Sequence, residues 1–210
     1  MKPKLLDRTA EYLDARGAEL DRITPERRLA LQRIADYVQS RLVEGECARL
    51  LFICTHNSRR SHFGQVWARI AAFRRELELV ETFSGGTEVT AFEPRAAAAL
   101  ERAGLTVEQV SESPNAVHRV SYAPCARPLE LFSKTIHDQA NPSDAFCAVM
   151  TCNSADEACP VVPGATLRVS LPFGDPKLAD GRPDEAAVYD ERCAQICREM
   201  LYAFSLVEAQ

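Results

Sequence analysis

The stretch 50–61, Leu-Leu-Phe-Ile-Cys-Thr-His-Asn-Ser-Arg-Arg-Ser, constrains the fold more than any other part of the 210-residue chain. Its apolar beginning predicts a buried strand that ends at Cys54. From Phe63 to Phe73, apolar residues recur at three- and four-residue steps, which predicts an amphipathic helix. A polar loop at a helix N-terminus carries unpaired N–H groups and the positive end of the helix dipole. The loop is therefore a predicted site for a tetrahedral oxyanion.

Three side chains of this stretch have the chemistry to act on such an oxyanion. The positive field favours thiolate over thiol at Cys54, and the planar guanidinium of Arg60 suits two oxygens of phosphate or arsenate. Ser61 can donate a hydrogen bond to the sulfur and stabilise it as a leaving group. The alternative is that Cys54 is a buried structural cysteine and that the arginines after it lie at a solvated helix start. The strand, loop and helix around Cys54 favour the catalytic interpretation.

The order of apolar runs predicts a three-layer α/β domain, with a four-stranded parallel sheet and helices on both faces. After the strand at 50–54, further strands are expected at 77–84, 145–151 and 166–171. The helices expected between and after them are 61–73, 95–103 and 184–204. Ligands of such sheets bind beyond the C-terminal ends of the strands, where Cys54 lies.

The first part of the chain adds two predicted helices, one at 4–18 and one from Pro25 to Gly45. The apolar face of the second includes Leu29, Leu31, Ile34, Val38 and Leu42. We therefore expect a helical extension at 1–46 and an α/β domain at 47–210.

Prolines interrupt the pattern between 113 and 141, which predicts a long loop or a small ribbon. Long loops often cover functional sites, so Tyr122, Arg127 and Lys134 are candidates for contacts with a substrate.

The chain resembles the low-molecular-weight protein tyrosine phosphatase superfamily, which includes the thioredoxin-coupled arsenate reductases. The resemblance runs from about Leu50 to the C-terminus and rests on four segments: 54–61, Ser-Gly-Gly-Thr at 84–87, 152–160 and Asp-Pro at 175–176. It departs from the family at His56, where a glycine is usual, and at Arg59, where arsenate reductases usually have a cysteine. The resemblance implies that the oxyanion is bound by the loop residues Thr55, His56, Asn57, Ser58 and Arg59.

The resemblance also implies roles for a cysteine pair and a carboxylate. Cys152-x6-Cys159 is similar to the redox segment of thioredoxin-coupled arsenate reductases. That likeness implies a relay of thiols from Cys54 to Cys152 to Cys159, with thioredoxin as electron donor and no bound cofactor. Asp175 occupies the place of the general acid that phosphatases of the superfamily use to protonate a leaving group.

Three functions remain open at this point. The first is arsenate reduction by the thiol relay. The second is phosphomonoester hydrolysis on a phosphorylated side chain such as phosphotyrosine, using Cys54, Arg60 and Asp175, with the cysteine pair protecting Cys54 from overoxidation. The third is a noncatalytic sensor of oxyanions or thiols, in which His56 and Arg59 have made the loop unable to support catalytic turnover.

Composition excludes several other classes. A net charge of -5 and a pI near 5.5 argue against nucleic-acid binding, which needs a basic surface. The first residues lack a signal-peptide core and no later run reaches transmembrane length, so we expect a cytoplasmic protein without membrane contacts. Eight cysteines without an export signal indicate free, redox or metal-binding thiols. Structural zinc is the competing explanation, but Cys193-x3-Cys197 has no obvious second pair of ligands, so no metal is predicted.

Overall fold

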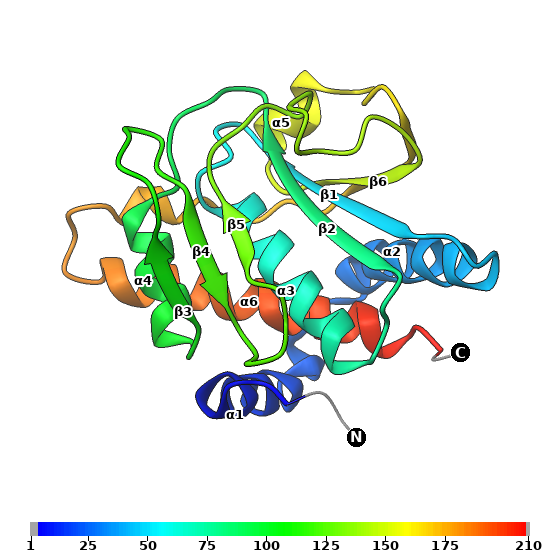
Figure 1. Ribbon diagram of the computed structural model, residues 1–210, viewed down its shortest axis with the longest axis horizontal. Helices are drawn as coiled ribbons and strands as arrows, with labels where there is room; N and C mark the ends of the chain where they lie inside the picture. The colour runs from blue at the N-terminus through cyan, green and yellow to red at the C-terminus, as the bar shows by residue number, and fades with distance from the viewer. Residues whose placement is uncertain (1–3, 209–210) are drawn as a thin grey trace.

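The computed structural model describes residues 4–208, and its centre is a parallel sheet of four strands in the order β2-β1-β6-β7 (Figure 1). The strands are β1 (Ala48–Cys54), β2 (Val80–Gly86), β6 (Phe146–Met150) and β7 (Ala165–Ser170). All three neighbouring pairs are parallel. The predicted fold class is therefore confirmed.

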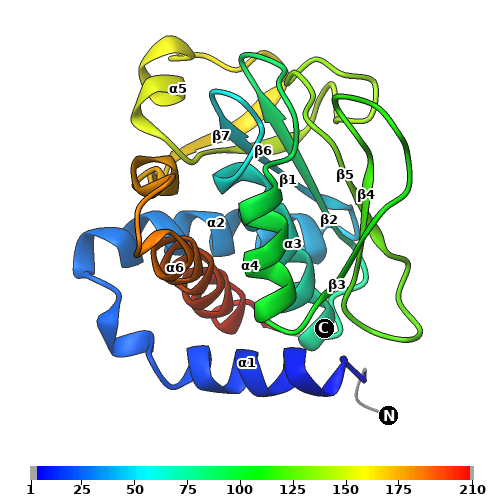
Figure 2. The ribbon, with the colours of Figure 1, turned by 90° about the vertical axis from the view of Figure 1, so that its left-hand side faces the viewer.

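Helices cover both faces of this sheet. One face carries three long helices, α2 (Pro25–Val43), α3 (Arg60–Arg74) and α6 (Glu185–Ser205), and the other carries the short helix α5 (Asn153–Ala158). Figure 2 shows α2, α3 and α6 together on one side of the sheet and α5 apart from them. Strand β1 has the alternation that this arrangement requires, because Leu50 and Phe52 belong to one buried cluster and Leu51 and Ile53 to the other.

Close packing between α3 and β1 determines where the loop between them lies. A Cβ atom added at Gly64 would come within 2.4 Å of the ring of Phe52. Only a glycine therefore permits the helix to approach the strand so closely. This contact lies one turn into α3, so it fixes the start of the helix above the end of β1.

The N-terminal helices share the core of the sheet. Helix α1 (Asp7–Gly17) and α2 bury Leu13, Leu31 and Ile34 completely in the same apolar cluster as β1. The predicted apolar face of α2 is wrong at Leu29, whose exposed fraction is 72%. Leu29 lies two positions before the buried Leu31, which is about 200° around the helix. The division of the chain at 46/47 stays a prediction.

The interrupted segment contains part of a second, antiparallel sheet in the order β3-β4-β5. Its strands are β3 (Thr106–Gln109), β4 (His118–Ser121) and β5 (Leu129–Leu131), and α4 (Pro94–Arg102) precedes them. The expected ribbon corresponds to β4 and β5, whereas β3 and the short helices α5 and η2 (Pro176–Ala179) were not expected. These three elements have only four to six residues, too few for periodicity to show.

Within residues 4–208, no helix is both long enough and apolar enough to span a membrane.

Candidate active site

The loop of residues 55–59 joins β1 to α3, and three of its carbonyl oxygens accept hydrogen bonds from the segments around it. Neighbouring segments donate hydrogen bonds to the carbonyl oxygens of Thr55 (Glu88 N, 2.9 Å), His56 (Ser133 Oγ, 2.8 Å) and Ser58 (Glu93 N, 3.1 Å). Because the described peptide bonds are all trans, the N–H of each following residue points the opposite way. The N–H groups of His56, Asn57 and Arg59 therefore point away from these hydrogen-bond donors, and N–H groups of this kind are what oxyanion binding requires.

The loop has one residue in the left-handed region, and that residue is Asn57, with φ 43°. Asparagine accepts this conformation more readily than most side chains. His56 stands where the phosphatases that the chain resembles usually have a glycine. It is not among the described residues with positive φ, so its side chain causes no backbone strain. A glycine is needed instead in β2, because a Cβ atom at Gly86 would lie 2.7 Å from the carbonyl oxygen of Thr55.

Ser61 lies against the sulfur of Cys54. The distance from Ser61 Oγ to Cys54 Sγ is 3.1 Å, and Asn57 Nδ2 donates to the same Ser61 oxygen at 2.9 Å. Since Asn57 already occupies an acceptor position of the hydroxyl, the hydroxyl proton is free to point at the sulfur. The backbone N–H of Lys134 donates to Asn57 Oδ1 at 2.9 Å and holds the amide in this orientation.

Arg60 and Asp175 form an ion pair at the start of α3. Arg60 Nη2 donates to Asp175 Oδ2 at 2.6 Å, and Arg60 Nη1 donates to the carbonyl oxygen of Phe173 at 3.0 Å. Asp175 also caps η2 by accepting from the N–H of Lys177. The structure therefore brings together the predicted arginine and the predicted general acid. An oxyanion that binds Arg60 would compete with this carboxylate.

Arg59 has different partners, although it is the next residue in the chain. Its Nε donates to the hydroxyl of Tyr189 at 3.1 Å and its Nη2 donates to Glu93 Oε2 at 3.3 Å. Its Nη1 lies 4.0 Å from Asp175 Oδ1. The guanidinium of Arg59 is therefore tied to α4 and α6, and Arg59 contributes its backbone N–H to the loop.

Cys152 lies beside the loop because β6 is the neighbour of β1. The N–H of Thr151 donates to the carbonyl oxygen of Ile53 at 2.7 Å, so the two strands end level with each other. Cys152 Sγ is 3.5 Å from Thr55 Oγ1 and accepts from the N–H of Ala155 at the start of α5. The second predicted thiol is thus buried next to the residue that follows Cys54.

Cys159 lies at the other end of α5 and is half-buried. At 1.5 Å of rise per residue, the Cα atoms of Cys152 and Cys159 are about 10 Å apart, beyond the roughly 7 Å that a disulfide can bridge. Arg168 of β7 holds this end of the helix by donating to the carbonyl oxygens of Cys159 (3.0 Å) and Asp156 (2.6 Å). Helix α5 must therefore unwind before these two cysteines can join.

The supporting roles of His62 and Lys134 behind the loop had no clear signal in the sequence. His62 is fully buried, and its Nδ1 lies 3.1 Å from Ser84 Oγ at the end of β2. Burial, and then the charge of Lys134, lower the pKa of His62 well below its ordinary value, so its ring stays neutral. Lys134 supports Asn57 through its backbone, which no side-chain pattern can reveal. A single histidine in an apolar helix likewise looks like a core residue.

The predicted contacts of Tyr122 and Lys134 with a substrate are not supported. Tyr122 is 1% exposed, its ring packs edge-on against Phe73, and its hydroxyl accepts from Arg69. Lys134 is 4% exposed. Both side chains point into the protein because they lie on or next to the small antiparallel sheet, which packs on the core. Arg127 is exposed, at the edge of the same sheet.

All eight cysteines are free. Among residues 4–208, no three His, Cys, Asp or Glu side chains are grouped closely enough to hold a metal ion.

The sheet order and the helix layers define an α/β fold that solved structures share, with the C-x5-R-S loop at the end of its strand β1. In sequence the chain is similar to arsenate reductases. The arsenate reductase of Bacillus licheniformis is 24% identical over 159 residues, which are 74% of this chain and 94% of that protein. That of Halalkalibacterium halodurans is 26% identical over 136 residues, 65% of this chain and 79% of that protein. No family model matches the chain.

Solved structures agree on the fold. A YwlE mutant from Bacillus subtilis has a TM-score of 0.51 and 13% identity, covering 75% of this chain and 97% of its own. The YwlE arginine phosphatase, with a phosphorylated serine in its active site, has a TM-score of 0.51 and 14% identity, covering 75% and 93%.

Proposed function

We propose that the protein is an arsenate reductase in which Cys54, Cys152 and Cys159 act in succession. The observation that carries this proposal is the position of the cysteine pair: Cys152 lies beside the oxyanion loop, 3.5 Å from Thr55 Oγ1, and Cys159 ends the helix that Cys152 begins. A phosphatase needs neither thiol for hydrolysis. The sequence similarity to two arsenate reductases, which includes most of the chain, supports the same choice.

The first step is nucleophilic attack by Cys54. Arsenate binds with its oxygens against the inward N–H groups of the loop, and Arg60 turns from Asp175 to two of them. The thiolate of Cys54 forms a bond to arsenic(V), and one arsenic–oxygen bond breaks, so that water leaves after protonation. The product is an arsenic(V) ester of Cys54, and no electrons have yet been transferred.

The second step transfers two electrons. The thiolate of Cys152 attacks the sulfur of Cys54, a disulfide bond forms, and the electron pair of the sulfur–arsenic bond moves to arsenic. Arsenic(V) becomes arsenic(III) and leaves as arsenite, while the two thiols are oxidised. The buried position of Cys152 next to Thr55, the residue that follows Cys54, supports this step.

The third step moves the disulfide to the surface. Cys159 attacks Cys152 and releases the thiolate of Cys54, leaving a Cys152–Cys159 disulfide. Because α5 separates these residues by about 10 Å, the helix unwinds during this exchange. Thioredoxin is the proposed electron donor. Its thiolate can attack only an accessible disulfide, and Cys159 is already partly exposed at a helix end.

The test is a pair of assays on the same preparation. Wild-type protein with thioredoxin, thioredoxin reductase and NADPH should oxidise NADPH only when arsenate is present. Cys159→Ser should stop after one turnover and accumulate a Cys54–Cys152 disulfide, visible by mass spectrometry of peptides. Cys125→Ser, at an exposed cysteine outside the site, is the matched control and should leave turnover unchanged.

Phosphomonoester hydrolysis is the second candidate, and the Arg60–Asp175 pair favours it. Asp175 lies where the acid of a phosphatase would protonate a leaving group, beside the arginine that binds the phosphoryl oxygens. Asp175→Asn should then slow hydrolysis of phosphotyrosine, whereas Cys152→Ser should not. If the wild type shows this pattern and no arsenate-dependent NADPH oxidation, the reductase proposal fails and the phosphatase remains.

A further inference from the structure

His62 follows Ser61 directly and is fully buried behind the loop, but no step of the proposed reaction uses it. Its Nδ1 lies 3.1 Å from the hydroxyl oxygen of Ser84, and its ring packs edge-on against Phe92 with 4.8 Å between the ring centres. Its Nε2 is buried and makes no hydrogen bond. Buried polar atoms are normally paired, so a partner for this nitrogen is expected among its neighbours.

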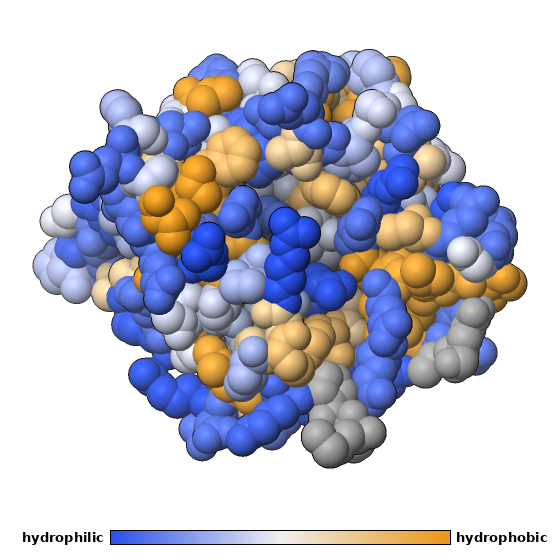
Figure 3. Space-filling model, in the orientation of Figure 1, coloured by the Kyte–Doolittle hydropathy of each residue, from blue (hydrophilic) through white to orange (hydrophobic). Residues whose placement is uncertain are grey.

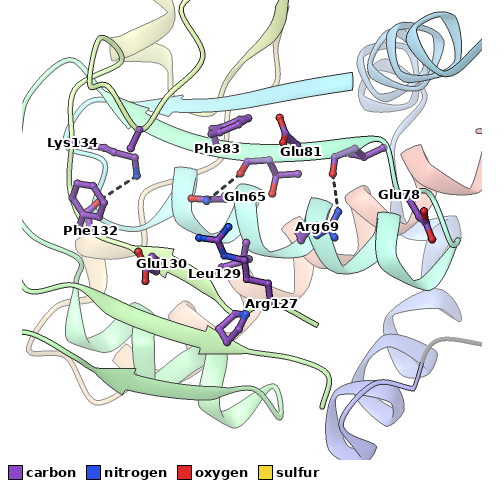
Figure 4. Close-up of a pocket in the computed structure, with 14 residues that line it drawn as sticks. Gln65, Arg69, Glu78, Glu81, Phe83, Arg127, Leu129, Glu130, Phe132 and Lys134 are labelled. Carbon is purple, nitrogen blue, oxygen red and sulfur yellow. Dashed lines mark hydrogen bonds between the residues drawn. The ribbon is translucent and has the colours of Figure 1, made fainter. Parts of the chain in front are cut away.

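The imidazole of His62 is neutral, and a nearby lysine helps to keep it so. Burial lowers the pKa of His62 first, and the charge of Lys134 lowers it further. The pKa of Lys134 is about 8, so its ammonium is charged at pH 7. Figure 4 shows this side chain beside Phe132, whose carbonyl oxygen lies 3.5 Å from Nζ, on the wall of a cavity of about 420 Å³. The cavity opens on the face drawn in Figure 3, whose middle is dominated by hydrophilic side chains. The charge of Lys134 therefore disfavours a second proton on the His62 ring.

A neutral imidazole has one N–H, and the surroundings of the ring indicate which nitrogen carries it. The hydroxyl of Ser84 has no hydrogen-bond partner within residues 4–208 except His62 Nδ1. When that hydroxyl donates to Nδ1, the ring proton lies on Nε2. Helical side chains tilt toward the N-terminus of their helix, so the third residue of α3 reaches back toward the loop. The acceptor for Nε2–H is therefore expected in the loop.

One carbonyl group of the loop lacks a donor, and it belongs to Asn57. Every other carbonyl of residues 55–59 accepts a hydrogen bond, either from a neighbouring segment or, at Arg59, from the N–H of Phe63. No hydrogen bond within residues 4–208 reaches the carbonyl oxygen of Asn57. The backbone of Asn57 nevertheless lies close enough to the His62 ring to favour a proton on it. The unpaired nitrogen and the unpaired carbonyl are therefore close together.

We propose that His62 is a positioning residue for the peptide bond between Asn57 and Ser58. Its Nε2–H donates to the carbonyl oxygen of Asn57 when an oxyanion occupies the loop. Because this peptide bond is trans, the N–H of Ser58 then points away from His62 and is available to the oxyanion. His62 does not touch the oxyanion itself. The inference rests on the oxyanion loop of the proposed function, and it applies to a reductase and to a phosphatase alike.

The two hydrogen bonds of this peptide support each other. An oxyanion attracts the N–H of Ser58, which turns the carbonyl oxygen on the other side of the same peptide toward His62. The unpaired state of Nε2 is then relieved only when the loop is occupied. His62 therefore strengthens oxyanion binding from behind the loop, because both buried groups gain a partner in the bound state.

Two substitutions separate the tasks of the two ring nitrogens. The amide nitrogen of glutamine takes roughly the place of Nε2, so His62→Gln keeps the donor to Asn57 and loses the acceptor for Ser84. The amide of asparagine takes roughly the place of Nδ1, so His62→Asn does the reverse. Calorimetric titration of the full-length proteins with phosphate measures the effect. His62→Asn should bind phosphate about tenfold more weakly than the wild type, and His62→Gln within about threefold of it.

Phe92→Leu is the matched control, because it removes the ring that packs on His62 and leaves both nitrogens in place. Urea unfolding should show that all three variants lose stability, while only His62→Asn loses phosphate affinity. The proposal is overturned if His62→Asn binds phosphate as the wild type does, or if His62→Gln is weakened as much as His62→Asn. It is also overturned if affinity follows the free energy of unfolding in all three variants.

A measurement on the wild type covers the case of a variant that does not fold. Nitrogen NMR shifts of the His62 ring distinguish a protonated nitrogen from a bare one. In saturating phosphate, Nε2 should carry the proton, and a proton on Nδ1 instead overturns the proposal. A wild type that binds no phosphate would refute the oxyanion loop of the proposed function and this inference with it, whereas the variants and the ring proton test His62 alone.

Discussion

Arg59 and Arg60 are adjacent in the chain, but their side chains have separate tasks. Arg60 lies at the start of α3, where its Nη2 donates to Asp175 Oδ2 at 2.6 Å. Arg59 is bound to Tyr189 and Glu93 and joins the loop to the helices behind it. The spacing of the motif favours Arg60 as the catalytic arginine, and these contacts agree with that prediction.

Replacing each arginine by lysine should separate the two tasks. Arg60→Lys keeps the charge but loses the planar contact with two oxygens, so kcat/KM should fall by an equivalent of about 2–4 kcal/mol. Arg59→Lys should reduce the free energy of unfolding by about 1 kcal/mol and change kcat/KM much less. Steady-state kinetics and urea unfolding measure the two quantities. Equal losses of kcat/KM at both positions would mean that the catalytic arginine is assigned wrongly.

The thiols should also differ in reactivity. Iodoacetamide at pH 7 should modify Cys54 first, and phosphate should slow that reaction by occupying the loop. Cys47 is the internal control, because burial and the nearby Glu81 raise its pKa to about 11. Peptide mass spectrometry after short exposure measures both rates. Phosphate-independent alkylation of Cys54 would contradict the loop as an oxyanion site.

Helix α5 has opposing roles in the structure and in the proposed reaction. It keeps Cys152 buried beside the loop and holds Cys159 too far away to form a disulfide. Its attachment to the sheet is concentrated at its C-terminal end, where Arg168 binds two of its carbonyl oxygens and the Asp156 carboxylate. Helices of six residues have little stability of their own, so we expect this clamp to limit how often α5 opens.

Removing the clamp should accelerate the last thiol exchange. Arg168→Ala loses the hydrogen bonds to Cys159 and Asp156, so α5 should unwind more often, and mild oxidation with diamide should form the Cys152–Cys159 disulfide about tenfold faster. Arg102→Ala, which removes an exposed ion pair with Asp190 on another face, is the control and should leave the rate unchanged. An unchanged rate in Arg168→Ala would show that this arginine does not limit the opening of α5.

Helix α2 helps to hold the segment that carries Asp175, through contacts that Arg27 makes with α6 and with residues 172–173. Arg27 of α2 donates to both carboxylate oxygens of Glu199 in α6, at 2.6 and 2.7 Å, and to the carbonyl oxygen of Pro172. Its guanidinium also lies 4.6 Å from the centre of the Phe173 ring. The segment that carries Asp175 is thus held from the opposite end of the chain.

Lys134 should make the stability of the whole protein depend on pH. Burial lowers the pKa of Lys134 to about 8, from 10.5 in the unfolded chain. Between these values the unfolded chain binds more protons, so this contribution to the free energy of unfolding rises with pH, by on the order of 3 kcal/mol. It is complete above pH 10.5 and is lost as pH falls to 8.

The measurement is urea unfolding of wild type and Lys134→Met between pH 7 and 10. The neutral variant should be the more stable protein at pH 7, and the difference should shrink as pH rises. A difference that does not change with pH would show that the ammonium is hydrated rather than buried.

Local patterns predicted the large elements well. The apolar run before Cys54, the repeat from Phe63 to Phe73, and Pro25 after Thr24 correspond to β1, α3 and the start of α2. Each of these sequence patterns involves residues that lie within one or two helical turns, or within one strand, of each other. Strand β3 and helix α5 were not predicted, because an exposed strand of four residues and a helix of six leave no periodic signal.

The sequence alone determined the spacing of Cys54 and Arg60, the cysteine pair and the alternation of strands and helices, because these are properties of residues close together in the chain. Only the tertiary structure decided that Arg59 turns away to Tyr189, that Cys152 meets the loop at Thr55, and that Lys134 is buried beneath Asn57. Each of these contacts joins residues more than 70 positions apart. Such contacts depend on which strands become neighbours in the sheet and on which helices cover it, and no local periodicity records that choice.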